Sequence, residues 1–113
     1  MPPRVELLFW DGCPSHPRAL ADLRAALADA GLDPSAVIQL EIQDDAGAAR
    51  ECFTGSPTIR IDGRDVVPST GEPVQLACRV YRRRDGRISP VPDPDDLRDA
   101  LRRAHSPSEG ATP

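Results

Sequence analysis

The sequence predicts a single α/β domain with a four-stranded mixed sheet and three helices, in the order β-α-β-α-β-β-α. A nearly continuous apolar run over residues 5–10, interrupted only by Glu6, is typical of a strand buried on both faces. A helical repeat of leucine and alanine follows over residues 17–30. A second strand pattern then begins at Val37, and a β-α-β unit of this kind requires parallel strands joined by a right-handed crossover.

The first helix and the second strand have recognisable ends. Gly31 suits the position just after a helix end, and Pro34 prevents the helix from continuing. Residues 37–42 alternate between apolar and polar side chains, which predicts a strand. A short second helix is expected from Asp44 through residues 52–53, and Gly55 is expected to close it.

Two more strands are predicted after the second helix. Thr58–Ile61 is the third strand, and Asp62-Gly63 is a strong signal for a tight turn into an antiparallel neighbour. We expect residues 64–73, which contain two prolines and a glycine, to form a loop. Residues 74–81 then form the fourth strand, which pairs with the third.

The last helix is predicted to begin at Pro94, with Asp93 as its N-cap and further acidic residues in its first turn. Its apolar face consists of Leu97, Ala100, Leu101 and Ala104. Residues 106–113 are rich in serine, proline and glycine and are expected to be disordered. The predicted domain therefore spans residues 1–105, and residues 106–113 form its tail.

Composition narrows the possible functions. The net charge of −4 argues against nucleic acid as a partner. No stretch approaches the roughly 18 consecutive apolar residues of a membrane span, and no secretory signal precedes the first strand. We therefore expect a cytoplasmic protein, in which the three cysteines are thiols rather than structural disulfides.

Cys13 is the strongest candidate for a reactive residue, because it stands where the first strand ends and the first helix begins. Free N–H groups and the dipole of a helix start stabilise a thiolate and lower its pKa below about 8.5. We expect Cys13 to be partly exposed, because Gly12 and Pro14 keep the turn open, and to be the most reactive of the three thiols. The alternative is a buried cysteine that packs as a small apolar residue.

His16 follows Cys13 by three residues, so the two share one face of a helix. Its imidazole could hydrogen-bond the thiolate or act as an acid or base. It could equally be an ordinary exposed histidine in the first helical turn. In either case the motif is Cys-x-x-His, and no disulfide can form within it.

Cys78 is the most plausible partner thiol, although a cysteine in the middle of a strand also suits core packing. If the third strand separates the first from the fourth, Cys13 and Cys78 lie two strand spacings of about 4.8 Å apart. A disulfide needs Cα atoms within about 7 Å, so we expect three free thiols. Cys52, beside Phe53, is expected to be buried and inert.

The cysteine at the helix start, the motif Gly-Ser-Pro-Thr-Ile at residues 55–59 and the final helix together resemble the thioredoxin-like superfamily over residues 4–104. The motifs Phe-Trp-Asp-Gly-Cys-Pro at 9–14 and Cys-Arg-Val-Tyr at 78–81 look like those of small bacterial thioredoxin-like proteins, some of which are called DF-family (seleno)proteins. The resemblance implies a thioredoxin-like fold, thiol chemistry and a cis peptide bond before Pro57. His16 stands where a thioredoxin has its second cysteine.

A second similarity links Thr-Gly-Glu-Pro-Val-Gln-Leu at residues 70–76 to a segment of organomercurial (alkylmercury) lyases. Those enzymes use two separated cysteines and an aspartate to cleave a carbon–mercury bond. The similarity implies Cys13 and Cys78 as the cysteine pair, with His16 where an acid is wanted and Asp11 as its neighbour. Thiolates also bind soft metals in other folds.

Two functions follow as hypotheses. The first is a thiol-dependent oxidoreductase, in which Cys13 attacks a disulfide or peroxide and Cys78 or an external thiol resolves the intermediate. His16 and Pro57 complete its expected catalytic positions, and its partner is a protein or a small-molecule thiol or disulfide. The second is a non-enzymatic binding module for a partner or a soft metal. Neither function needs a cofactor or a resident metal, and neither involves a membrane or nucleic acid. The arginines at 82–84 are expected to form the solvated end of a hairpin.

Overall fold

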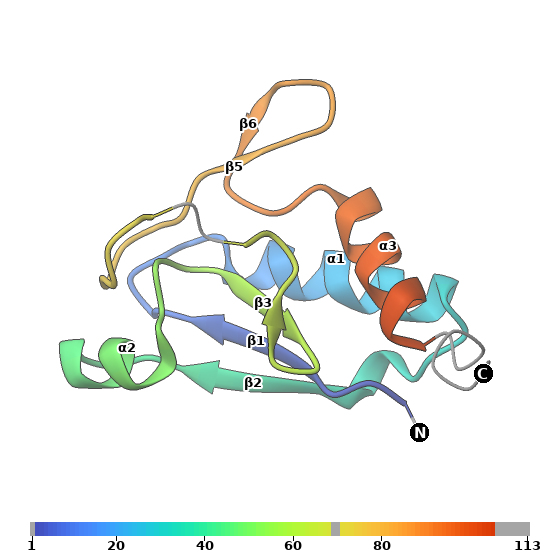
Figure 1. The fold of residues 1–113 in the computed structure, drawn as a ribbon, viewed down its shortest axis with the longest axis horizontal. Coiled ribbons are helices and arrows are strands. Elements are labelled where there is room, and N and C mark those ends of the chain that lie inside the picture. Colours follow the sequence, from blue (N-terminus) through green and yellow to red (C-terminus); the bar gives the residue numbers. More distant parts are fainter. Residues whose placement is uncertain (1, 69–70, 106–113) are drawn as a thin grey trace.

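The structure is a computed structural model that describes residues 2–68 and 71–105 (Figure 1). Its elements in chain order are β1 (Val5–Phe9), α1 (His16–Asp29), the 3-10 helix η1 (Pro34–Ala36), β2 (Val37–Glu41), α2 (Asp45–Glu51), β3 (Thr58–Ile61), β4 (Arg64–Asp65), β5 (Tyr81–Arg82), β6 (Ile88–Ser89) and α3 (Pro94–His105). The predicted α/β class, with three α-helices and a four-stranded mixed sheet, is confirmed.

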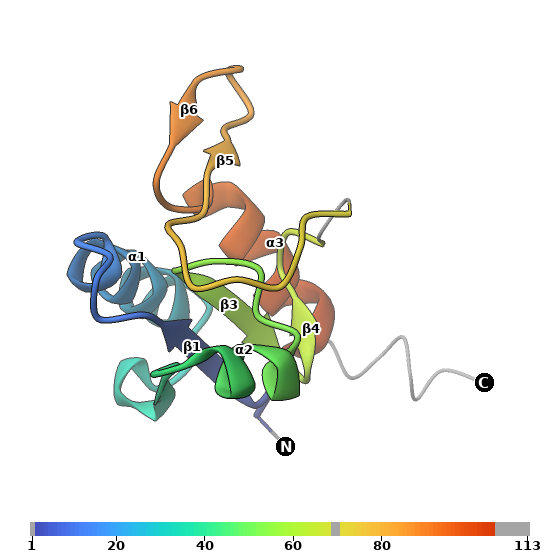
Figure 2. The same ribbon diagram turned by 90° about the vertical axis from the view of Figure 1, so that its left-hand side faces the viewer.

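The four-stranded sheet has the order β2-β1-β3-β4, with β1 as an interior strand. β1 runs parallel to β2, with Val5 opposite Val37, and antiparallel to β3, with Leu7 opposite Ile59. β3 and β4 form a hairpin around the predicted Asp62-Gly63 turn. A separate hairpin, β5–β6, projects from the body of the molecule in Figures 1 and 2.

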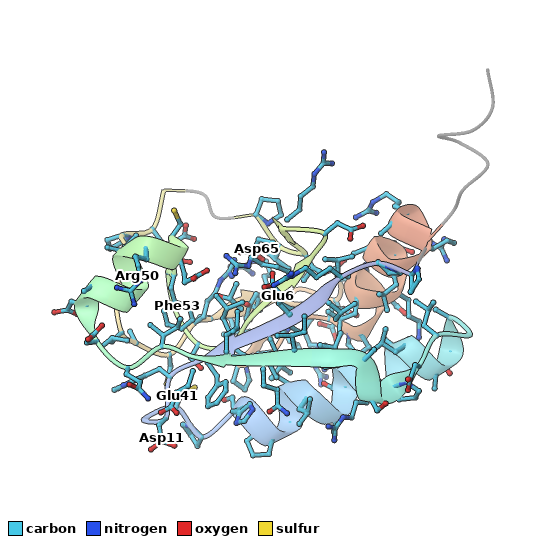
Figure 3. The ribbon with its side chains drawn as sticks, turned by 90° about the horizontal axis from the view of Figure 1, so that it is seen from below. Glu6, Asp11, Glu41, Arg50, Phe53 and Asp65 are labelled. Carbon is cyan, nitrogen blue, oxygen red and sulfur yellow. The ribbon has the colours of Figure 1, made fainter. Side chains whose placement is uncertain are left out.

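Two apolar clusters fix the helices on opposite faces of the sheet (Figure 2). Alternation along β1 sends Val5 and Leu7 to the face that α1 and α3 cover, and Leu8 to the other face. On that second face Leu8 packs with Phe53, which lies beside α2 in Figure 3. The buried residues of the first cluster are Val5, Leu7, Ala19, Leu23, Ala26, Leu27, Ile59, Ile61, Val91, Leu97, Ala100 and Leu101.

The ends of the long helices follow the capping residues in the sequence. Gly31 has a φ of +76°, and its N–H donates to the Ala28 carbonyl while the N–H of Leu32 donates to the Leu27 carbonyl. This is the hydrogen-bond pattern of a glycine-terminated helix. At the start of α3 the Asp93 carboxylate accepts from the Asp95 N–H, as an N-cap does.

The predicted fourth strand was wrong. The strand that pairs with β3 is Arg64–Asp65, directly after the tight turn, because a two-residue turn joins neighbouring strands and leaves no room for another segment. β4 therefore occupies the sheet edge that residues 74–81 were predicted to take. Those residues run outside the sheet as far as β5, and an isolated bridge pairs Cys78 with Ser56, just before β3.

Smaller differences concern α2 and the termini. Cys52 has a φ of +53° and ends α2, so Cys52 rather than Gly55 is the closing residue. It is exposed, contrary to the prediction that it is buried, because the left-handed cap turns it away from the apolar face. The hairpin predicted around residues 82–87 is present as β5–β6. The predicted disordered tail, 106–113, lies outside the described residues.

No helix within residues 2–68 and 71–105 is long and apolar enough to cross a lipid bilayer.

Candidate active site: Cys13 and Cys78

Cys13 lies in the turn between β1 and α1, where its N–H donates to the Trp10 carbonyl at 2.9 Å. The side chain is buried, with 4% of its surface exposed. The turn is closed because the Trp10 ring lies over Gly12, so close that a Cβ added there would stand 2.5 Å from a ring carbon. The expectation that Gly12 and Pro14 leave Cys13 partly exposed was therefore wrong.

Ser56 joins Cys13 to the segment that precedes β3. The Cys13 thiol donates to the Ser56 carbonyl at 3.4 Å, and the Ser56 hydroxyl oxygen accepts from the Trp10 N–H at 3.0 Å. The Ser56–Pro57 peptide bond is cis, as the resemblance implied. Pro57 is buried, and its carbonyl accepts a hydrogen bond from the Tyr81 hydroxyl.

The same serine brings Cys78 to Cys13. The Ser56 N–H donates to the Ala77 carbonyl and the Ser56 carbonyl accepts from the Arg79 N–H, both at 2.7 Å. Cys78 lies between these two anchors, and its thiol is close enough to that of Cys13 for each to shift the pKa of the other. The predicted separation by two strand spacings was therefore wrong, because Cys78 does not lie on the fourth strand. The prediction that all three cysteines are free thiols is confirmed.

The two thiols differ in how readily they ionise. Burial acts most strongly on the pKa of Cys13 and raises it, but hydrogen bonds from the Ser15 N–H, the Cys78 thiol and the hydroxyls of Ser56 and Ser15 together outweigh burial, so that its pKa is lowered. The pKa of Cys78 is raised, first by its hydrogen bond to Cys13, then by burial and by the negative charge of the Cys13 thiolate. Cys13 is thus the first of the pair to lose its proton.

We expect the ultraviolet absorbance of the thiolate to rise at a pH below the ordinary thiol range near 8.5 in a Cys52→Ser protein, and this first titration to disappear in Cys13→Ser. Adding Cys78→Ala should move the Cys13 titration to higher pH, because one hydrogen bond to the thiolate is lost. A Cys13 titration at or above the ordinary thiol range in the Cys52→Ser protein would contradict this assignment.

His16 contacts Phe9 and Gln39 rather than the Cys13 thiol. Its ring stacks on Phe9, with centroids 3.7 Å apart and planes 2° from parallel, and its Nε2 lies 2.9 Å from the Gln39 side-chain oxygen on β2. The hydrogen bonds to the Cys13 thiolate come instead from residues 15, 56 and 78. The structure thus favours a packing role for His16 at the start of α1. The group that does share the helix start with the thiol is Ser15.

A buried arginine fixes the segment that carries Cys78. The guanidinium of Arg79 bonds Asp65 at 2.7 Å, Thr58 at 3.2 Å and the Val67 carbonyl, and lies 4.6 Å from the centre of the Tyr81 ring. Only 9% of the Arg79 side chain is exposed. These contacts tie residues 78–81 to β3 and β4. The sequence did not predict that Ser15, Asp65 and Arg79 belong to this site. Of the three, only Ser15 leaves a signal in the sequence, because it is a hydroxyl residue just after the cysteine at a predicted helix start.

Cys52 and Asp11 lie apart from the pair. Cys52 is on the rim of a hollow of about 1000 Å³ beside β3 and β4, a hollow that neither Cys13 nor Cys78 lines. Asp11 is exposed in the β1–α1 loop, at the outer edge of the molecule in Figure 3. Within the described part of the chain, histidine, cysteine and acidic side chains form no group of three that could hold a metal ion.

The chain matches no protein-family model, no curated protein and no solved structure at a significant level.

Proposed function

We propose that this protein is a thioredoxin-like thiol–disulfide oxidoreductase whose redox pair is Cys13 and Cys78. The observation that carries the proposal is that Ser56 holds both cysteines: its carbonyl accepts from the Cys13 thiol, and its backbone pairs with residues 77–79 on either side of Cys78. The pKa of Cys13 is lowered and that of Cys78 is raised. Perturbed pKa values in a matched pair are typical of reactive sites. Because the motif at the helix start has a histidine in place of a second cysteine, the partner thiol comes from the segment after β4.

The topology supports the thioredoxin-like part of this proposal. The strand order β2-β1-β3-β4, with β1 parallel to β2 and antiparallel to β3, is the arrangement expected for that superfamily. Cys13 precedes α1, where the Ser15 N–H can stabilise a thiolate. The segment around Pro57 faces it through Ser56.

The proposed reaction transfers two electrons and two protons. Cys13 and Cys78 lose their protons and form one S–S bond, while an external disulfide gains the two electrons and the two protons and becomes two thiols. Forming the bond requires a closing movement of the two side chains that Ser56 holds near each other, since a disulfide needs about 2.05 Å between its sulfur atoms. The reverse reaction, with an external thiol as reductant, regenerates the pair. A reducing cytoplasm would keep the resting protein in its dithiol form.

The test is turnover of a model disulfide by Cys52→Ser protein compared with Cys52→Ser/Cys13→Ser and Cys52→Ser/Cys78→Ser. We expect each second substitution to lower the rate by about 10²-fold or more, because an adjacent thiol acts at a far higher effective concentration than one in solution. Mild oxidation of Cys52→Ser followed by peptide mapping should give a Cys13–Cys78 bond in high yield. Turnover independent of Cys13 and Cys78 would overturn the proposal and favour a binding module.

A further inference from the structure

Building on the proposed Cys13–Cys78 pair, we infer that external thiols and disulfides exchange at the Cys78 sulfur, so that Cys78 carries the mixed-disulfide intermediate and Cys13 acts only within the protein. This assigns roles opposite to those expected from the sequence, where Cys13 meets the substrate and Cys78 resolves the intermediate. The assignment follows from how the two side chains are placed.

Access distinguishes the two sulfur atoms. Exchange requires a thiolate to reach the sulfur that it attacks, so the rate depends on access as well as on ionisation. Cys13 is 4% exposed and is enclosed by the closed turn at Trp10, by Ser56 and by Cys78 itself. Cys78 is exposed, and two residues further along the same extended segment Val80 is 68% exposed. A molecule arriving from solvent therefore reaches Cys78 first.

The backbone beside Cys13 gives an external molecule no other path to the Cys13 sulfur. Ser56 uses both its N–H and its carbonyl to pair with residues 77–79 of its own chain. Its hydroxyl is also engaged, with the Trp10 N–H and with Cys13. To reach Cys13 directly, an external group would have to displace the segment that Arg79 anchors to β3 and β4. The outer side of Cys78 needs no such displacement.

The reaction is balanced at each step. An external thiolate attacks Cys78 Sγ of the Cys13–Cys78 disulfide; the S–S bond breaks, an S–S bond to Cys78 forms, and Cys13 leaves as a thiolate. A second external thiolate then attacks the external sulfur of the mixed disulfide, which releases the external disulfide and leaves Cys78 as a thiolate. The hydrogen bonds from Ser15 and Ser56 make Cys13 the better leaving group of the two. Oxidation by an external disulfide follows the same path in reverse.

The direct experiment uses the Cys52→Ser protein oxidised to the Cys13–Cys78 disulfide. It is mixed with glutathione for sub-second to second times, quenched with acid, alkylated with N-ethylmaleimide and mapped by mass spectrometry. The two sulfur atoms meet the same attacking thiolate, so the ratio of adducts reports how accessible each sulfur is and how readily the other sulfur leaves. We expect glutathione on Cys78 and the alkyl group on Cys13, with at least about a tenfold excess over the opposite pattern. Equal adducts, or more glutathione on Cys13, would overturn the inference while the proposed function stands.

A charge placed beside Cys78 gives a second measurement that needs no trapped intermediate. Val80→Glu should slow reduction of the disulfide by glutathione, whose thiolate form carries two net negative charges, about threefold, and should slow reduction by 2-mercaptoethanol, whose thiolate carries one, less, since like charges close together repel. The matched control is Ile88→Glu, at an equally exposed position of the β5–β6 hairpin. Identical glutathione rates in Val80→Glu and Ile88→Glu would count against attack at Cys78. Failure of the Cys52→Ser protein to form the disulfide would instead overturn the proposed function.

Discussion

Replacing Arg79 with leucine is expected to lower the free energy of unfolding by about 3–5 kcal/mol, because it leaves a partly buried carboxylate, Asp65, without its cation. The substitution also removes the bonds to Thr58 and the Val67 carbonyl that hold the segment after β4 against the sheet. With this anchor lost, Cys78 is no longer held at Cys13. We therefore expect intramolecular disulfide formation to slow by about 10²-fold, the effect of misplacing a reacting group by about 1 Å.

Arg84→Leu is the matched control for this experiment. Arg84 also bonds two carboxylates, Asp96 and Asp99, but half of its side chain is exposed and it lies on the β5–β6 hairpin, away from the thiols. Exposed ion pairs contribute little to stability, so Arg84→Leu should change the urea midpoint far less than Arg79→Leu and leave disulfide formation at the parent rate. Equal effects of the two substitutions on both measurements would show that Arg79 does not position Cys78.

Gly55→Ala is expected to destabilise the protein by about 2–4 kcal/mol and to slow Cys13–Cys78 disulfide formation strongly. Gly55 has a φ of +152°, and an added Cβ would lie 3.0 Å from the Arg79 Cβ and 3.2 Å from its Cα and backbone nitrogen. The bridge between Ser56 and Cys78 therefore requires a residue without a side chain at position 55. A methyl group there must push Arg79 outward, and Cys78 moves with it.

Gly31→Ala is the control for Gly55→Ala, because it has the cost of a positive φ without a contact with Arg79. Gly31 also has a positive φ, +76°, but a Cβ there would meet nothing within 4 Å. Its substitution should cost about 1–2 kcal/mol from the left-handed conformation alone and should not affect the thiols. Thermal unfolding and the rate of disulfide formation, measured on both variants, distinguish the two effects. If Gly55→Ala matched Gly31→Ala in both, the close approach of Arg79 would be unimportant.

The segment between β4 and β5 gives the site its second thiol without contributing a strand to the sheet. Its position depends on the backbone bonds of Ser56, the guanidinium of Arg79 and the Tyr81 hydroxyl bound to the Pro57 carbonyl. Each of these groups is partly or fully buried, where hydrogen bonds left unmade are costly. The dithiol is therefore built from tertiary contacts, and variants that weaken those contacts should lose Cys13–Cys78 disulfide formation before they lose the fold.

Elements whose residues interact locally could be predicted from the sequence. The buried first strand, the long amphipathic helix with Gly31 at its end and the acidic start of α3 all follow from periodicity and capping. The Asp62-Gly63 turn was also predicted, and the hairpin that it forms fills the sheet edge with β4, which is only two residues long. A strand this short leaves almost no periodic signal, which is why residues 74–81 were assigned in its place.

A cysteine at the start of α1 and a Ser-Pro segment before β3 could be predicted from the sequence, because both are set by residues next to each other in the chain. The approach of Cys78 to Cys13 through Ser56, the stacking of His16 on Phe9 and the exposure of Cys52 could not be predicted in this way. Those outcomes depend on contacts between residues far apart in the chain, such as Arg79 with Asp65, and on a left-handed cap at Cys52. Neither leaves a periodic pattern in the sequence, because both arise from packing, which only the folded chain defines.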